Sequence, residues 1–335
     1  MNFHYGGSLS VKKDRYIKPI EHIIFHCGNL LSEEKVLVLY DEKTELVSSL
    51  FKDYMECNFL NYEYIKIPYS CTHGTEPNNF VANKMLSSDL IIGLTSTSIA
   101  HTFARKNACD NGARYLSLPD YSIDLLQHPS ILTDYVKRAI TVKKVSDILS
   151  QGNSIRVLSK KGTDIWLPIN GRLGNCCPGY VKNPGDLGSP PDIEANIAPV
   201  EGAARGIIVT DGAIPCKDIG LLNDDVTLLV KDGNLVKIKS QNKDYVDTLN
   251  NIFSDVGSIK AYNIAEFGVG LNEMCTLTGN MLTDEGSYGT VHFGIGSNAT
   301  IGGKNDVSFH LDFVIRNPTV IIDDLILINE GVLVI

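Results

Sequence analysis

The sequence lacks the motifs that assign a chain quickly to a binding class. Its 335 residues contain neither G-x-G-x-x-G nor G-x-x-x-x-G-K-[ST], so no dinucleotide or P-loop site is indicated. No dense cluster of Lys and Arg is present and the formal net charge is -9, so we expect no nucleic-acid partner. Function must be sought in other side chains.

Long apolar runs are also missing, and the longest are strand-length and interrupted by charge. Residues 1–15 lack the apolar segment of a signal peptide. The eight cysteines are scattered without a C-x-x-C pair, so we expect reduced thiols rather than a disulfide framework. Together these absences predict a cytoplasmic protein with no membrane partner.

The length and the change of pattern along the chain predict two domains, residues 1–150 and 151–335. The first alternates strand and helix patterns, as in the strand at 35–41 and the helix at 42–58, which predicts an open, mostly parallel α/β domain. The second has short apolar strands and Gly-rich turns, with helical periodicity only at 243–255. It is predicted to be a mixed, largely antiparallel β domain that carries a metal site. Residues 170–198, rich in Gly, Pro and Asn, are predicted to be a long irregular stretch.

The most informative residues are ionisable groups inside apolar strand patterns: Glu266, His292, His310 and Asp312. Buried charge is costly unless it is paired or bound to a metal. His310 and Asp312 are two residues apart on a predicted strand, so their side chains face the same side. They are either a chelating pair or a simple hydrogen-bonded pair, and a lone His such as His292 on an apolar strand is more often structural.

Three further acids are candidates. Glu201 follows Pro199 and is either a ligand or an exposed turn residue. Asp284 and Glu285 precede the strand of His292 and are a ligand, a general base or part of a polar turn.

Two imidazoles with several carboxylates suit a divalent ion such as Zn, Mn, Co or Fe(II). Two imidazoles and one carboxylate with open positions suit a single non-haem Fe(II). A larger set of carboxylates suits two bridged cations in a hydrolytic site.

At these residues the sequence resembles the M29 aminopeptidases of the aminopeptidase T type and the related 2,5-dihydroxypyridine 5,6-dioxygenases. The resemblance covers mainly residues 155–335, and its matching stretches are VEGAARGIIVTDG, AYNIAEFGVGLN, TGNMLTDEGSYGTVHFGIGSN and IGGKNDVSFHLDFVIRNPTVIIDD. The peptidase motif implies that two metal ions are bound by the five residues Glu201, Glu266, His292, His310 and Asp312.

The two branches differ at diagnostic positions. The dioxygenases have a His where this chain has Glu266 and a Ser where it has His292, so the peptidase-type residue stands at both positions. The chain length and the segment 302–317 are more similar to the dioxygenases, and Ala299 replaces a Tyr of the peptidases.

These observations predict a metal-dependent, aminopeptidase-like hydrolase of an amide or peptide bond in a small molecule or short peptide. Two cations, Zn, Mn or Co, would activate a water, and Glu201 or Glu285 would take its proton. The alternative is a mononuclear Fe(II) ring-cleaving dioxygenase of the 2,5-dihydroxypyridine type that uses His292, His310 and Asp312. A third possibility, a binding module without activity, is disfavoured by the complete ligand set. The resemblance also implies a homodimer.

Overall fold

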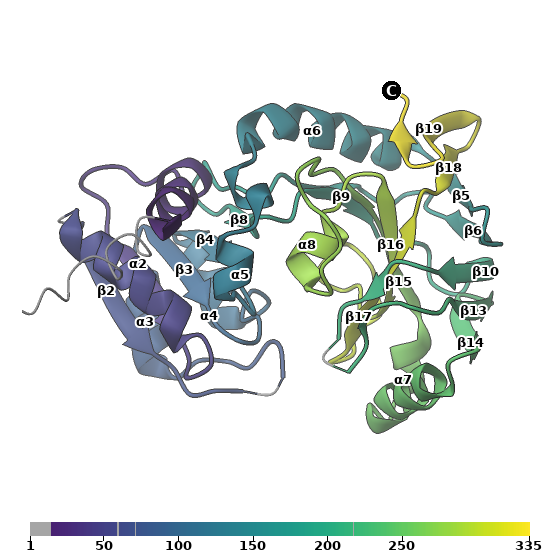
Figure 1. Ribbon diagram of the computed structural model, residues 1–335, viewed down its shortest axis with the longest axis horizontal. Helices are drawn as coiled ribbons and strands as arrows, with labels where there is room; N and C mark the ends of the chain where they lie inside the picture. Colours follow the sequence, from purple (N-terminus) through teal and green to yellow (C-terminus); the bar gives the residue numbers. More distant parts are fainter. Residues whose placement is uncertain (1–14, 59, 71, 217) are drawn as a thin grey trace, which may run out of the picture. The chain divides into compact units, whose positions relative to one another are not determined.

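The computed structural model describes residues 15–335 except 59, 71 and 217 (Figure 1). It divides into two compact units, of which unit 1 comprises the chain up to Tyr135 together with Gly179–Pro190, and unit 2 comprises Val136–Pro178 and Pro191–Ile335. The sequence predicted a single boundary after residue 150. The difference arises because nearly all of helix α6 (Tyr135–Gln151) belongs to unit 2, where the Ser146 hydroxyl donates to the carbonyl of Gly174 at 2.9 Å.

Unit 1 is built on a five-stranded parallel sheet in the order β2-β1-β3-β4-β8 (Figure 1). Its strands are β1 (Val36–Tyr40), β2 (Tyr62–Lys66), β3 (Leu90–Leu94), β4 (Arg114–Ser117) and β8 (Leu187–Gly188). Its helical elements are η1 (His22–Cys27), α2 (Glu45–Cys57), α3 (Asn79–Leu86), α4 (Phe103–Asp110), α5 (Ile123–Leu126) and η2 (Pro129–Leu132). The buried residues Val47, Phe51 and Met55 recur every four positions, so α2 presents one apolar face.

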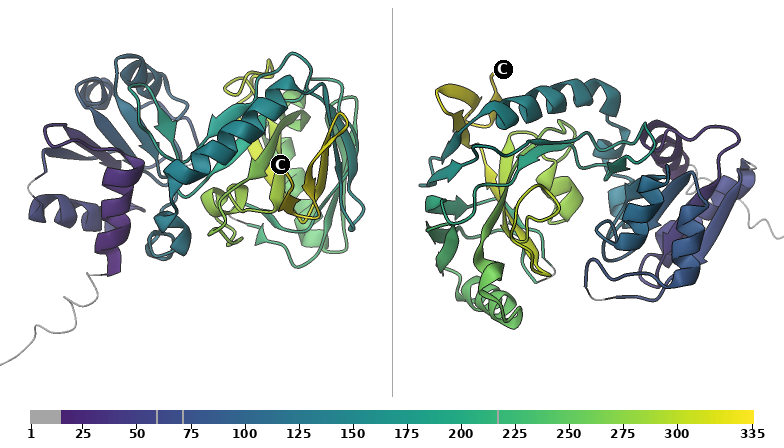
Figure 2. Two further views of the ribbon diagram at one scale, coloured as in Figure 1. Left: turned by 90° about the horizontal axis from the view of Figure 1, so that it is seen from above. Right: turned by 180° about the vertical axis from the view of Figure 1, so that it is seen from behind.

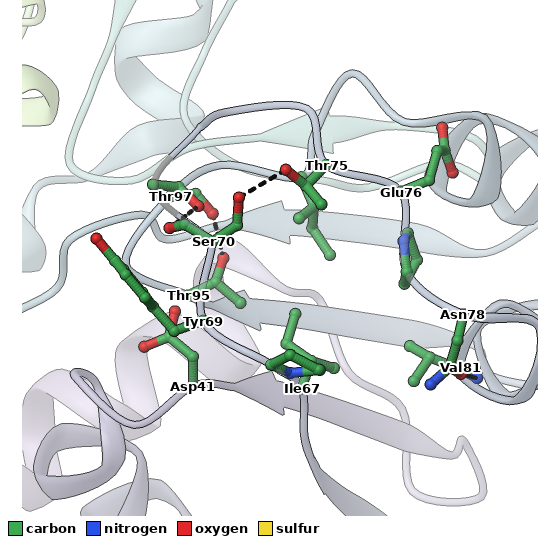
Figure 3. A pocket seen from close by; sticks show the side chains of 13 residues that line it. Asp41, Ile67, Tyr69, Ser70, Thr75, Glu76, Asn78, Val81, Thr95 and Thr97 are labelled. Carbon is green, nitrogen blue, oxygen red and sulfur yellow. Dashed lines mark hydrogen bonds between the residues drawn. The ribbon is translucent and has the colours of Figure 1, made fainter.

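A cavity of about 270 Å³ lies in unit 1, beyond the carboxyl ends of β1, β2 and β3 (Figure 3). Hydroxyl groups, including those of Ser70, Thr75 and Thr97, share its wall with apolar side chains such as Ile67 and Val81. None of the predicted metal ligands is among the described residues that line it.

Unit 2 contains two antiparallel sheets, with the orders β14-β13-β10-β6-β5-β18-β19-β20 and β12-β11-β17-β16-β15-β9-β7 (Figures 1 and 2). The strands of the first are β5 (Ser154–Leu158), β6 (Asp164–Pro168), β10 (Arg205–Thr210), β13 (Val226–Lys231), β14 (Asn234–Ser240), β18 (Thr319–Ile322), β19 (Leu325–Asn329) and β20 (Val332–Leu333). The strands of the second are β7 (Asn175–Cys177), β9 (Glu194–Ile197), β11 (Ala213–Ile214), β12 (Gly220–Leu221), β15 (Ile264–Gly270), β16 (Thr290–Gly296) and β17 (His310–Arg316). The parallel and antiparallel sheets confirm the predicted fold class.

Short helices complete unit 2: α7 (Lys243–Asp255), η3 (Ile259–Tyr262) and α8 (Met281–Glu285). Helix α7 confirms the helical period at 243–255, whereas α8 was not predicted. Helix α8 contacts β15, β16 and β17 (Figure 1). Within the part of the chain that the structure describes, no helix is long and apolar enough to span a membrane.

Candidate metal centre

Strands β15, β16 and β17 place the predicted imidazoles and carboxylates on one face of the seven-stranded sheet. Glu266 pairs with Gly294, which in turn pairs with Asp312, so the two carboxylates flank a glycine across three strands. Side chains alternate between the faces of a strand. The neighbours of these three residues along their strands are Phe267, Phe293 and Phe313. Their side chains therefore point to the opposite face, where all three are fully buried. One face of the sheet is therefore apolar, and the other carries the imidazoles and carboxylates.

Two glycines leave room for the imidazoles. A Cβ on Gly268 would lie 2.1 Å from Cε1 and Nε2 of His292, and a Cβ on Gly294 would lie 2.4 Å from Nε2 of His310. Each ring therefore lies across the strand next to its own, over a position that admits only a hydrogen atom.

The imidazoles meet the carboxylates at short distances. His310 Nε2 is 3.2 Å from Asp312 Oδ1 and 3.3 Å from Glu266 Oε2. His292 Nε2 is 3.1 Å from Glu194 Oε2 and 3.8 Å from Glu266 Oε1. Two groups result, Glu266–His310–Asp312 and Glu194–Glu266–His292, and within each the ligand atoms lie within 4.8 Å of one another. Glu266 belongs to both groups.

The structure adds Glu194 and Asp192, which the sequence analysis missed. Both lie at or just before β9, inside the stretch predicted to be irregular, and Glu194 pairs with Gly270 of β15. Asn196 Nδ2 donates to Glu194 Oε1 at 2.7 Å and fixes its carboxylate. The signal in the sequence is the spacing of two acids and Asn196, each two residues from the next, in the segment Asp-Ile-Glu-Ala-Asn-Ile.

The acids of helix α8 have different roles. The Asp284 carboxylate accepts from the backbone N–H groups of Thr278 at 2.7 Å and of Gly279 at 2.9 Å, so it holds a turn. Glu285 lies against Asp312, and its buried Oε1 has no hydrogen-bond partner. Glu285 thus borders the cluster, although its predicted role as a general base stays a prediction.

Glu201 is not brought into either group. One carboxylate oxygen forms an ion pair with Arg172, and the other accepts from Asn298 Nδ2 at 3.0 Å and from the Lys304 backbone N–H at 2.7 Å. These donors occupy the oxygens that a metal ion would need.

The cluster contains more carboxyl groups than imidazoles. Its members are Asp192, Glu194, Glu266, Glu285, Asp312, His292 and His310. Burial raises the pKa of Asp192 well above its usual value, and the neighbouring Glu194 carboxylate raises it further. Burial also raises the pKa of Glu266, but hydrogen bonds from both imidazoles lower it more, so that it ends below its usual value.

The pKa values of both imidazoles are raised. Burial lowers each pKa, but Glu194 beside His292, and Asp312 beside His310, bring each well above the usual 6.5.

The donor set fits a divalent metal ion. Buried acids accumulate at such density where a cation offsets their charge. Asp192 Oδ1 and Glu285 Oε1 are buried without a hydrogen-bond partner, as expected of carboxylate oxygens that await a ligand. The side chain of His292 is 1% exposed and that of His310 is 32% exposed, so the cluster is open on the His310 side.

The chain as a whole matches a family of known proteins. A family model described as 2,5-dihydroxypyridine 5,6-dioxygenase matches residues 64–335. A 2,5-dihydroxypyridine 5,6-dioxygenase of Pseudomonas putida KT2440 is 25% identical over 270 residues, which are 76% of this chain and 73% of the relative.

Two solved structures have a similar fold. A 2,5-dihydroxypyridine dioxygenase from Pseudomonas putida KT2440 matches with a TM-score of 0.82 and 19% identity, over 96% of this chain and 97% of the other. Wild-type AmpT from Thermus thermophilus matches with a TM-score of 0.66 and 12% identity, over 96% of this chain and all of the other.

The expected aminopeptidase-like hydrolase is therefore wrong. The family match and the curated relative both belong to the dioxygenases, and the likeness to AmpT shows a shared fold alone. Glu266 and His292, which favoured hydrolysis, are ligand types that several divalent metals accept, so they do not decide the reaction.

Proposed function

Because the chain belongs to the 2,5-dihydroxypyridine 5,6-dioxygenase family, we propose that it is an iron(II)-dependent dioxygenase that opens the ring of a dihydroxylated pyridine. The observation that carries the proposal is the family match over residues 64–335, a range that contains every residue of the buried cluster. The reaction adds the two atoms of O₂ to two adjacent ring carbons of the substrate and cleaves the bond between these carbons.

We propose that Glu266, His310 and Asp312 hold the iron. The acids supply negative charge, and His310 Nδ1 faces the carbonyl oxygen of Ser297 at 2.9 Å, which leaves Nε2 for the metal. When bound, iron(II) supplies the redox chemistry through which O₂ reacts with an electron-rich hydroxylated ring. His292 and Glu194 form the closed side of the cluster, so the substrate enters on the exposed side of His310.

The test is oxygen consumption by protein reconstituted anaerobically with iron(II) and supplied with 2,5-dihydroxypyridine. We expect one O₂ consumed per ring opened, and under ¹⁸O₂ both labelled atoms in the product. Protein loaded with zinc and the variant Asp312→Asn are the controls, and both should be inactive.

The relative is only 25% identical, so a panel of dihydroxypyridine isomers and dihydroxybenzenes should be assayed alongside. Turnover of another dihydroxypyridine would keep the reaction and change the substrate. An iron-loaded protein that consumes no O₂ with any member of the panel would contradict the proposal.

A further inference from the structure

The loop between β16 and β17 carries one of the orienting contacts of the metal centre. This loop, residues 297–309, begins after the strand of His292 and ends at His310. Its first carbonyl, that of Ser297, is the partner of His310 Nδ1 at 2.9 Å. Its ends are joined by a backbone hydrogen bond of 2.8 Å from Ser297 N–H to the carbonyl of Phe309. The orientation of His310 therefore depends on how this loop is held.

Glu201 holds the loop directly at two points and at a third through Arg172. Oε1 accepts from Asn298 Nδ2 at 3.0 Å and from the Lys304 backbone N–H at 2.7 Å. Oε2 pairs with Arg172, which also donates to the carbonyl of Gly302 at 2.6 Å. Burial raises the pKa of Glu201, but the N–H of Lys304 and the other donors lower it by more. The pKa therefore ends below its usual value, and the carboxylate stays charged.

Asn298 transmits this hold to the neighbouring Ser297. Its side chain is fully buried, and its Oδ1 accepts from the Asn305 backbone N–H at 2.8 Å. A Cβ on Gly303 would lie 2.0 Å from the Asn298 amide carbon, so the loop is packed closely around this side chain. A displacement of Asn298 would move the Ser297 carbonyl with it, because the two residues share a peptide bond.

A second hydrogen-bonded route leads from the loop to the other half of the cluster. Asn175 Nδ2 donates to the carbonyl of Ile301 at 3.2 Å and to Asn196 Oδ1 at 2.7 Å. Asn196 in turn donates to Glu194 at 2.7 Å. The loop is thus connected to His310 in one ligand group and to Glu194 in the other.

We propose that Glu201 is a positioning residue of the metal centre, which acts through Asn298 and the loop 297–309 to fix the carbonyl that orients His310. The inference rests on the proposed binding of a metal at His310, but not on the ring-cleaving reaction. Partners that orient a metal-binding His typically change metal affinity by about 10- to 100-fold when they are removed.

Binding of Co(II) to the full chain tests the proposal, since the visible absorption of Co(II) reports its coordination independently of activity. We expect Glu201→Ala to raise the Kd for Co(II) by about 10- to 100-fold and to change the absorption bands. Glu201→Gln should fall between this variant and the wild type, because its amide oxygen can still accept from the loop.

Asp323→Ala is the matched control. The Asp323 carboxylate likewise accepts from two backbone N–H groups, those of Asn153 and Ser154, and from their side chains, and all four of these donors lie outside the loop 297–309. It should lose stability without a change in Co(II) affinity or spectrum.

An unchanged Kd and spectrum in Glu201→Ala, or an equal loss of affinity in Asp323→Ala, would overturn the inference. If Glu201→Ala does not fold, the variants Glu201→Gln and Arg172→Met test the proposal in the same Co(II) binding assay. Wild-type Co(II) affinity in both variants would reject the positioning role of Glu201. A wild-type protein that binds neither Co(II) nor Fe(II) would reject the proposed function together with this inference.

Discussion

The imidazole of His310 lies over Gly294 of the neighbouring strand, in the space that a side chain would fill. A Cβ at position 294 would lie 2.4 Å from His310 Nε2 and 2.8 Å from Glu266 Cβ. Gly294 also stands between Glu266 and Asp312 in the register of the sheet. The absence of one carbon atom thus allows three proposed ligands to converge.

Gly294→Ala should therefore weaken metal binding while unit 2 remains folded. The added methyl group must displace the His310 ring or the Glu266 stem, and we expect a loss of Co(II) affinity of about 10-fold or more. Titration by isothermal calorimetry measures it. Gly257→Ala is the control, because its φ of +65° makes the substitution costly for stability while a Cβ there meets no atom within 4 Å, so Co(II) affinity should not change. Wild-type affinity in Gly294→Ala would show that the ring position is not needed.

The two ligand groups can be told apart by single substitutions. If the ion lies between Glu266, His310 and Asp312, then Asp312→Asn removes a direct ligand and should abolish measurable Fe(II) binding. Glu194→Gln removes only a neighbour of His292, so a loss of about 10-fold is expected. Iron content after anaerobic loading and desalting gives the result, and the reverse order of effects would place the ion in the group that contains Glu194.

The stability of the metal-free protein should fall as the pH rises above about 6.5. Raised pKa values of His292 and His310 mean that the folded state binds more protons than the unfolded state. Their contribution is complete below the unfolded-state pKa near 6.5 and is lost as the pH passes the folded-state pKa. The raised pKa values of Asp192 and Glu285 act with the same sign.

Metal binding should reverse this trend, because the ligands must be deprotonated. We expect the Tm in EDTA to fall, and the Tm with saturating Co(II) to rise, between about pH 6 and pH 8. Calorimetry at several pH values measures both. A metal-free Tm that rises in parallel with the metal-loaded Tm would contradict the assignment.

Phe293 supports the opposite face of the same sheet. It is fully buried, and its ring centroid lies 5.8 Å from that of Phe267. Phe293→Ala should lower the free energy of unfolding of unit 2 by about 3–5 kcal/mol. Leu173→Ala, in the same unit at a residue that is 76% exposed, should change stability little. Urea unfolding compares the two, and equal effects would contradict the assigned faces.

Local patterns were sufficient for much of the architecture. The alternation of strand and helix patterns before residue 150 predicted the parallel sheet, and the short apolar strands after it predicted the antiparallel sheets. Both predictions depend only on the periodicity of residues that are neighbours in the sequence. The pair His310 and Asp312 could also be assigned to one face from their spacing alone. Strand β9 escaped prediction because it has four residues and lies in a segment rich in Gly and Pro.

The sequence by itself indicated that Glu266, His292, His310 and Asp312 lie in apolar strands. It also indicated that His310 and Asp312 face the same side of their strand. Only the tertiary structure decided which further carboxylates join them. Glu194 reaches His292 through the pairing of β9 with β15, whereas Glu201, seven residues later, is held by Arg172 and the loop 297–309. Proximity between such distant segments is set by strand register and loop packing, and no local spacing encodes either.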